Sequence, residues 1–191
     1  MNTVKQDASV ILDKALELGS EEGWEALRLS RVADALGISL VTVYQHYRQK
    51  DDLVEAWFDR ADRAMLETRL VLVPASLAPQ QRLEKALWCW LQTLSKYHNL
   101  TGQMLLYKLE PGHIHLQIGG VLRISRTVQW LMEVADLNAT NLVRIRQEIA
   151  LSALFVSTFI EWLNDSSAQQ QRTRKRLQQK LRVTTLLKLW Q

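Results

Sequence analysis

Apolar side chains recur at spacings of three and four residues along most of the chain, which is the period of an amphipathic α-helix. In residues 7–18 this apolar face comprises Ala8, Ile11, Leu12, Ala15, Leu16 and Leu18. No segment shows the sustained alternation of apolar and polar residues that is typical of β-strands. The sequence therefore predicts an all-α fold of about nine helices. They cover residues 7–18, two short segments within 30–50, and residues 51–72, 80–97, 99–109, 116–135, 141–163 and 167–189.

Glycine and proline mark the ends of several of these helices. Gly19 and Gly23 are expected to break the chain after the first helix, and Pro79 is suited to the first turn of the helix that follows it. The segment 110–112, Glu-Pro-Gly, is expected to end another helix. With only 7 glycines and 3 prolines in the chain, long helices joined by short turns fit best.

Residues 30–50 have the pattern of a helix-turn-helix. Ser30 is suited to cap the first short helix, because its hydroxyl can accept a hydrogen bond from an unpaired N–H of the opening turn. Gly37 is suited to end that helix, because glycine adopts the left-handed conformation without a Cβ clash. Ser39 is a candidate cap for the second helix. The small and apolar residues that allow the two helices to cross closely are Ala33, Gly37, Ile38 and Val43.

Length and composition fit a globular protein. A chain of 191 residues, 47% hydrophobic and 23% charged, is long enough for one large or two small domains with an ample core. Cys89 is the only cysteine, so a reducing compartment is expected. No apolar run approaches the ~18 residues of a membrane span, and the first residues lack the apolar stretch of a signal peptide. We therefore expect a cytoplasmic protein.

The net charge of +4 is unevenly distributed. Residues 1–50 carry six basic and seven acidic side chains, but within residues 28–50 the four cations Arg28, Arg31, Arg48 and Lys50 face the single acid Asp34. This local excess lies where phosphates would contact a helix-turn-helix. Residues 166–191 carry seven cations and no acid, so the tail makes the whole chain basic.

The segment from Ile11 to Trp57 resembles the DNA-binding domain of the TetR family of transcription regulators. The resemblance is carried by Ala15, Leu18, Gly23, Ser30, Val32, Ala33, Leu36, Gly37, Ile38, Ser39, Thr42, Val43, Tyr44, His46, Tyr47, Lys50 and Leu53. It implies a helix-turn-helix DNA-binding domain in residues 1–50 and a ligand-binding and dimerisation domain in residues 51–191. It also implies a homodimeric repressor that binds a palindromic operator in double-stranded DNA and responds to a small effector. The alternative is a helical hairpin used only for packing.

The resemblance assigns phosphate contacts to Ser30, Tyr44, His46 and Lys50. Hydroxyl, phenol and ammonium groups can all donate hydrogen bonds to phosphate oxygens, which positions a protein on DNA without reading its sequence. Residues 39–46 are expected to face the base edges. The expected reading residues are Leu40, Val41, Thr42 and Gln45, with the cap Ser39 beside them.

The chemistry of these reading residues points to A·T pairs. Glutamine can pair with adenine, and apolar groups such as Leu40, Val41 and the methyl group of Thr42 can contact thymine methyls. Leu40 and Val41 stand where the family often has a basic or polar residue and a glycine. This departure indicates either a T-rich site or weakened DNA binding, and we favour the T-rich site.

The body also resembles the C-terminal part of the ubiquinone-biosynthesis protein COQ9 and of its bacterial TetR-like relatives. The resemblance covers about residues 80–182 and is carried by segments 128–135 and 159–166. It includes a Trp-x-x-Asp-x-Ser pattern formed by Trp162, Asp165 and Ser167. The function it implies is the alternative one, a lipid-binding accessory protein with a vestigial helix-turn-helix.

Eight aromatic residues lie within residues 88–162 of the body. The family resemblance implies a cavity in the helical body, and apolar walls would suit a lipid-like or aromatic effector. Candidates for lining it are Trp88, Trp90, Tyr107, Trp130, Phe155 and Phe159, and the alternative for each is a place in the core. In the family the last two helices commonly form the dimer interface. Candidates there are Phe155, Trp162, Leu177 and Leu181.

The sequence gives no sign of catalysis. It has no Gly-rich phosphate loop and no nucleophile elbow, and Cys89 has no evident catalytic partner, so we expect neither enzymatic activity nor a cofactor. His113 and His115 are expected to be solvated rather than to bind a metal, since Glu110 is the only carboxylate close to them in the sequence.

The basic tail has three interpretations. The default is a bundle helix whose leucines face a partner while its cations lie at the surface. A membrane-surface helix is the less favoured alternative, with Val183, Leu186, Leu187 and Trp190 as its apolar side. Additional contact with DNA is the least favoured.

Overall fold

The described part of the chain is built from helices joined by turns. A computed structural model describes residues 2–71, 76–109 and 114–190, and every regular element in these ranges is helical, which confirms the predicted all-α class. The α-helices are α1 (Asn2–Glu22), α2 (Leu29–Leu36), α3 (Leu40–His46), α4 (Lys50–Val71), α5 (Pro79–Leu94), α6 (His98–Leu109), α7 (Ile114–Val134), α8 (Asn141–Leu163) and α9 (Gln171–Leu186). Two short 3-10 helices, η1 (Ser95–Tyr97) and η2 (Ala168–Gln170), precede α6 and α9.

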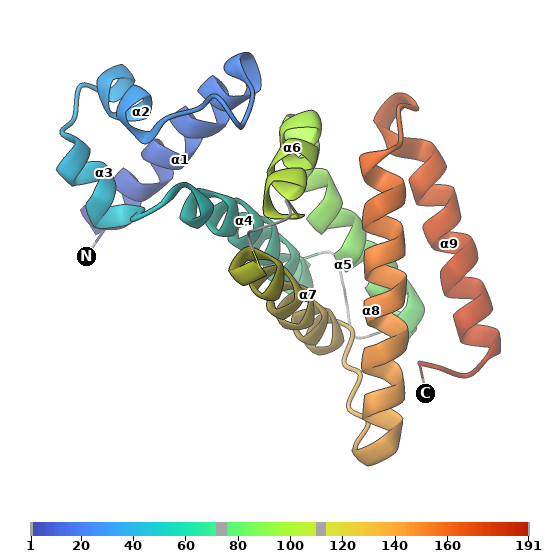
Figure 1. The fold of residues 1–191 in the computed structure, drawn as a ribbon. Coiled ribbons are helices and arrows are strands. Elements are labelled where there is room, and N and C mark those ends of the chain that lie inside the picture. The colour runs from blue at the N-terminus through green and yellow to red at the C-terminus, as the bar shows by residue number, and fades with distance from the viewer. Residues whose placement is uncertain (1, 72–75, 110–113, 191) are drawn as a thin grey trace.

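The helices form a head and a body (Figure 1). The head consists of α1, α2 and α3 at one end of the molecule, and α4 runs from the head into the body. In the body α4 packs along α5 and α7, while α8 and α9 lie side by side and both contact α5. The helix α6 contacts α1 of the head as well as α7 and α8 of the body. The helices α4 and α6 therefore connect the body to the head.

The first helix is longer than predicted. It continues to Glu22, through Gly19, and ends at Gly23, whose φ of 89° lies in the left-handed region. Gly19 was expected to break the helix, and this expectation was wrong. A Cβ atom on Gly19 would lie 3.3 Å from the side chain of Leu100, so the glycine permits a close approach of α1 and α6. Pro79 occupies the first turn of α5 as predicted, whereas segment 110–112 falls outside the described residues.

The core of the body is an aromatic cluster around Trp90. The rings of Phe58, Phe155 and Phe159 lie with their centroids 5.1–5.9 Å from that of Trp90, the phenylalanines of α8 edge-on and Phe58 stacked. These separations are favourable for aromatic pairs. The indole N–H of Trp90 donates to the carboxylate of Asp62 at 2.8 Å, so the ring is held by a hydrogen bond as well as by packing.

The connection from α8 to α9 depends on a buried carboxylate. Asp165, only 3% exposed, accepts hydrogen bonds from the backbone N–H of Ser167 at 2.9 Å and of Thr173 at 2.8 Å. The hydroxyl of Thr173 donates a third at 2.7 Å. Burial acts to raise the pKa of Asp165, but these hydrogen bonds outweigh it and hold that pKa well below its ordinary value.

We expect Asp165→Asn to lower the free energy of unfolding by about 1–3 kcal/mol at neutral pH, because an amide accepts more weakly and presents a donor to Thr173. The stabilising effect of a carboxylate with a depressed pKa is complete above its unfolded-state pKa of about 3.9 and is lost as the pH falls through the folded-state pKa. The difference between the two proteins in urea unfolding should therefore shrink as the pH falls below about 4. Asp34→Asn, on the exposed side of α2, is the control, and a difference that does not change with pH would contradict the assignment.

Candidate functional site

The helices α2 and α3 meet in a tight turn at Gly37. This residue has a φ of 65°, and the N–H groups of Gly37 and Ile38 donate to carbonyl oxygens of the last turn of α2 at 3.1 Å each. Ser39 caps α3, since its Oγ accepts a hydrogen bond from the N–H of Thr42 at 3.1 Å. Both features were predicted and are confirmed. The predicted cap of α2 was wrong: the helix already begins at Leu29, so Ser30 lies inside its first turn.

The helix α3 has one buried and one exposed face. Val43 is fully buried, and the hydroxyl of the buried Tyr47 donates to the carbonyl of Ala8 at 2.8 Å, so α3 is fixed on α1. On the opposite face lie side chains that point to solvent: Leu40 at 53%, Val41 at 66% and Tyr44 at 59% exposure, together with Gln45. The face thus presents apolar groups, a phenol and an amide, which are the groups that contact thymine methyls, phosphates and adenine.

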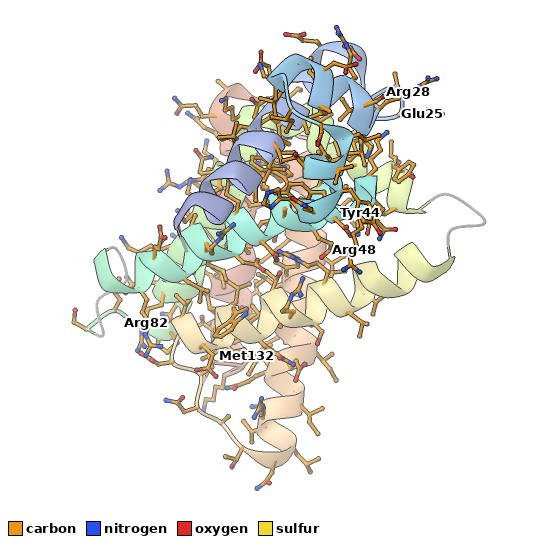
Figure 2. The ribbon with its side chains drawn as sticks, turned by 90° about the vertical axis from the view of Figure 1, so that its left-hand side faces the viewer. Glu25, Arg28, Tyr44, Arg48, Arg82 and Met132 are labelled. Carbon is orange, nitrogen blue, oxygen red and sulfur yellow. The ribbon has the colours of Figure 1, made fainter. Side chains whose placement is uncertain are left out.

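Two exposed cations lie next to the ends of the helix-turn-helix, Arg28 before α2 and Arg48 after α3. Arg28 and Arg48 are exposed, and neither forms an ion pair within the described part of the chain. Figure 2 shows them on the same side of the head as Tyr44. The guanidinium of Arg31 is 3.2 Å from the carboxylate of Glu22. Arg28 and Arg48 were not among the predicted site residues, although the local excess of charge in residues 28–50 pointed to them.

Lys50 has partners within the protein. Its ammonium donates to the carbonyl of Glu25 at 3.0 Å and lies 5.1 Å from the ring centre of Trp24 and 5.4 Å from that of Tyr107 on α6. Burial lowers the pKa of Lys50, and the charge of Glu25 opposes that shift. In this conformation Lys50 links the head to α6, and the predicted phosphate contact would require it to exchange these partners. His46 is half-buried at the end of α3.

A second candidate site is a cavity of about 260 Å³ in the body, between α4, α5, α6, α7 and α8. Its wall is almost entirely apolar. Three of the predicted residues, Trp90, Phe155 and Phe159, line it. The sequence did not identify the other lining residues, which are Glu55, Phe58, Leu105, Lys108, Gly120, Val121, Arg123, Ile124, Thr127, Val156 and Ile160.

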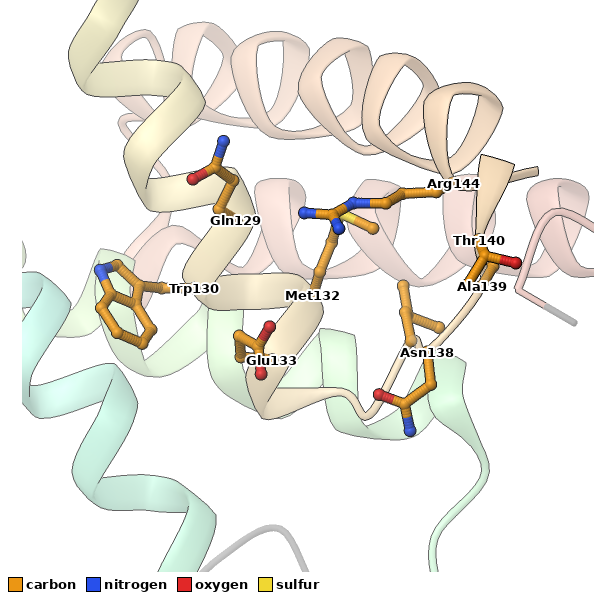
Figure 3. Close-up of a pocket in the computed structure, with 9 residues that line it drawn as sticks. Gln129, Trp130, Met132, Glu133, Asn138, Ala139, Thr140 and Arg144 are labelled. Atoms are coloured by element: carbon orange, nitrogen blue, oxygen red, sulfur yellow. The ribbon is translucent and has the colours of Figure 1, made fainter. Parts of the chain in front are cut away.

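The other three aromatic candidates do not line this cavity. Trp88 packs under the guanidinium of Arg174, 5.4 Å from the ring centre, and Tyr107 lies under Lys50 at the head. Trp130 lines a different, open cleft of about 390 Å³ between the end of α7 and the start of α8 (Figure 3). Polar and apolar groups contribute about equally to the wall of that cleft.

A buried polar network lies beside the cavity. The guanidinium of Arg123 donates to the carboxylate of Asp62 at 2.8 Å and also pairs with Asp59. Asp62 accepts from Trp90 and, at 3.0 Å, from the hydroxyl of Thr127. Burial raises the pKa of Asp62, and the charge of Arg123 opposes that shift. The network joins α4, α5 and α7, so the cavity wall is hydrogen-bonded directly to the helix that connects the body to the head.

The four predicted dimer residues are not at the surface. Phe155, Trp162, Leu177 and Leu181 are all buried inside the protomer, where they hold α8 and α9 on the body, so a second copy cannot contact them. Exposed apolar side chains lie instead on other faces of the same helices. They are Leu142, Val143, Ile145, Ile149 and Ile160 of α8 and Val183 and Leu186 of α9, followed by Leu187. Figure 1 shows the first turns of α8 extending beyond the neighbouring helices.

Two other features of the described residues bear on function. None of their helices is long and apolar enough to span a membrane. They also contain no group of three His, Cys, Asp or Glu side chains that could hold a metal ion, and His113 lies outside the described ranges.

The chain is similar to known bacterial regulators. Residues 11–57 match the family described as "Bacterial regulatory proteins, tetR family". The TetR transcriptional regulator from Nitrosomonas europaea ATCC 19718, whose crystal structure is known, is 36% identical to this chain in sequence. The match covers 94% of this chain and 98% of that chain, with a TM-score of 0.84. A TetR transcriptional regulator from Rhodococcus sp. RHA1 is 16% identical over 97% of this chain and 98% of that chain, with a TM-score of 0.67. A tetR-family transcriptional regulator from Streptomyces coelicolor is 16% identical over 92% and 79%, with a TM-score of 0.59.

At 16% identity, the structures from Rhodococcus sp. RHA1 and Streptomyces coelicolor are similar to this chain in fold alone. No curated protein matches the chain. The expected resemblance of residues 80–182 to COQ9 finds no support in these matches.

Proposed function

Because the chain belongs to the TetR family of transcription regulators, we propose that it is a homodimeric repressor whose DNA affinity is modulated by a small apolar effector. That it is a DNA-binding regulator follows from the family, whose members act by binding rather than by catalysis. The dimer, the repression and the effector are the proposal. We also propose that residues 1–50 are the DNA-binding domain and residues 51–191 the ligand-binding and dimerisation domain.

The exposed face of α3 is the observation that best supports operator reading. Leu40 and Val41 project from a short helix whose other face is fixed on α1. Exposed apolar side chains at this place serve no packing within the protomer, whereas they match the methyl groups of thymine in the major groove. Gln45 and Thr42 complete the proposed reading set, and Ser30, Tyr44 and His46 the proposed phosphate contacts, to which Arg28 and Arg48 are added.

The exposed apolar side chains of α8 and α9 support the dimer. Monomeric soluble proteins rarely expose contiguous apolar patches, and a patch on a projecting helix is typical of an interface with another chain. Two-fold pairing through α8 and α9 would place two copies of α3 on one face of the DNA, with half-sites separated by one or more helical turns of ~34 Å.

The cavity supports the effector. It is small compared with the ~300–1,000 Å³ of drug-sized ligand sites, and its aromatic and aliphatic wall suits an apolar molecule. Its wall residues Trp90, Arg123 and Thr127 hydrogen-bond to carboxylates of α4. A ligand that displaces this wall would change the position of α4 and therefore the distance between the two heads of the dimer. Such a ligand would shift the population of dimers between a conformation that binds DNA and one that does not.

Selection of bound DNA from a random pool tests the proposal. We expect a palindromic, T-rich consensus, and affinity for it that falls steeply with salt because phosphate contacts release counterions. Recovery of single half-sites would contradict the dimer, and absence of any sequence preference would contradict operator reading.

Two substitutions at neighbouring positions should separate phosphate contacts from base contacts. Tyr44→Phe removes a phenolic donor and should weaken binding to all sequences by a similar factor of about 3–10, the effect of one hydrogen bond. Gln45→Ala should instead relax the preference at one base pair, since a bidentate contact discriminates by ~1–3 kcal/mol. Repeating the selection with each variant checks both results. An altered consensus for Tyr44→Phe, or an unaltered one for Gln45→Ala, would contradict these roles.

A further inference from the structure

The charged side chains beside the cavity are already neutralised. Lys108, 4% exposed, has its ammonium 2.9 Å from the carboxylate of Asp51 and 2.7 Å from that of Glu55. Arg123, 7% exposed, pairs with Asp62 at 2.8 Å, with Glu55 at 3.3 Å and with Asp59. Both cations that line the cavity therefore have two or more carboxylate partners, and all of these partners lie on α4.

The carboxylates outnumber the cations. Asp51, Glu55, Asp59 and Asp62 are spaced by four, four and three residues, so they form one acidic face of α4. Among the residues that the structure describes, the cations that meet this face are Lys108, Arg123 and Arg126. Within that part of the chain, four acids against three cations leave no unpaired positive charge for an anionic ligand. An anion in this cavity would be desolvated without a partner, which is strongly unfavourable.

Hydrogen bonding within the cavity also favours a neutral ligand. Burial acts to raise the pKa of Glu55, but Lys108 and Arg123 outweigh it and hold that pKa below its ordinary value, so Glu55 stays a charged partner. The Nε of Arg123 is buried and has no acceptor among the described residues. A single N–H can be satisfied by a neutral oxygen, such as a carbonyl, and requires no charge on the ligand.

Gly120 keeps part of the cavity open. It lies inside α7 and lines the cavity, and a Cβ atom placed on it would meet nothing within 4 Å. A Cβ on the adjacent Gly119 would also meet nothing, but Gly119 does not line the cavity. Each glycine destabilises α7 by about 1 kcal/mol relative to alanine. Because a Cβ atom at either position would meet no neighbour, close packing does not explain why these residues are glycines. The open space at Gly120 belongs to the cavity.

We propose that this cavity binds an uncharged apolar molecule, and that the acidic face of α4 makes it reject an anion built on the same skeleton. The inference deepens the proposed function by stating the chemical class of the effector, and it rests on the cavity being the effector site. It excludes carboxylates, sulfonates and phosphates as effectors and admits aromatic or aliphatic molecules that carry at most a neutral oxygen.

Two fluorescent probes that differ by one charged group test the proposal. N-phenyl-1-naphthylamine is neutral, and 8-anilino-1-naphthalenesulfonate has the same phenyl and naphthalene groups with a sulfonate added. We expect the wild-type protein to bind the neutral probe at least about tenfold more tightly than the anion, which corresponds to ~1.4 kcal/mol. Similar affinities for the two probes, or tighter binding of the sulfonate, would overturn the proposal.

A pair of glycine variants locates the binding. Gly120→Leu should weaken binding of the neutral probe at least about tenfold, because the leucine side chain would occupy the space that the probe needs and a packed interior accommodates extra volume poorly. Gly119→Leu gains the same helix propensity and should bind like the wild type. Far-ultraviolet circular dichroism of both variants checks that they fold. Equal binding by both variants would show that the probe lies elsewhere and would overturn the proposal.

A third variant separates charge from size. The double variant Glu55→Gln with Asp62→Asn has nearly the same side-chain volumes and leaves two acids of this face against its three cations, with Asp59 as the remaining partner of Arg123. It should therefore bring the affinities for the two probes to within about threefold of each other. Asp13→Asn is the control and should keep the preference of the wild type. Asp13 lies on α1 of the head, where its carboxylate pairs with Arg60 of α4. If this double variant still rejects the sulfonate, then size and not charge excludes it, and the proposal is overturned.

The same probes distinguish this inference from the proposed function. Affinity for the selected operator is measured with and without N-phenyl-1-naphthylamine. If the probe binds in the cavity with the expected charge preference and the operator affinity does not change, then the effector role fails while the ligand class holds.

Discussion

Leu40→Glu is expected to lower affinity for the selected operator at least about 100-fold, because the substitution removes an apolar base contact and places a carboxylate among phosphates. One lost base contact is worth ~1–3 kcal/mol, and a two-fold dimer carries the substitution in both half-sites. Leu40 is exposed in the free protein, so the fold itself should not be affected. Fluorescence anisotropy with labelled operator measures the effect, and thermal unfolding should be unchanged.

Leu106→Glu is the matched control for this experiment. Leu106 is also an exposed leucine, at 69%, but it lies on α6 in the body. The control makes the same change in net charge, so a general electrostatic effect would appear in both variants. Equal loss of affinity in both would mean that residue 40 does not contact the bases, and retention of affinity by Leu40→Glu would remove α3 as the reading helix.

Ile149→Glu is expected to convert the dimer into monomers and, as a consequence, to remove most of the operator affinity. Ile149 is 66% exposed at a central position on the apolar face of α8. Two-fold pairing through this face would bring two buried carboxylates towards each other, and burying unpaired charges costs several kcal/mol. The dissociation constant of the dimer should therefore rise by about 100-fold or more. Sedimentation equilibrium measures it.

Leu106→Glu again serves as the control and should remain dimeric. Binding to a single half-site should survive in Ile149→Glu with low affinity, since α3 is unchanged. A variant that remains dimeric would place the interface on another surface, and the exposed apolar end of α9 would be the next to test.

The features of the head that sequence alone determined are local ones. The turn at Gly37 and the cap at Ser39 follow from steric and hydrogen-bonding rules that involve only a few consecutive residues. The buried face of α3 follows from helical period, as do most helix ranges, and α8 has the predicted bounds. The same rules did not place Gly19 inside α1, where a Cβ atom would crowd the side chain of Leu100, which is distant in the sequence.

The tertiary structure decided which surfaces and side chains belong together. Sequence period shows that Phe155, Leu177 and Leu181 lie on apolar faces, but it does not show whether such a face meets the same protomer, a ligand or a second copy. The pairing of Arg123 with α4 joins residues more than 60 positions apart. Such contacts depend on how helices cross and on how their side chains fill the space between them, and no short stretch of sequence contains that information.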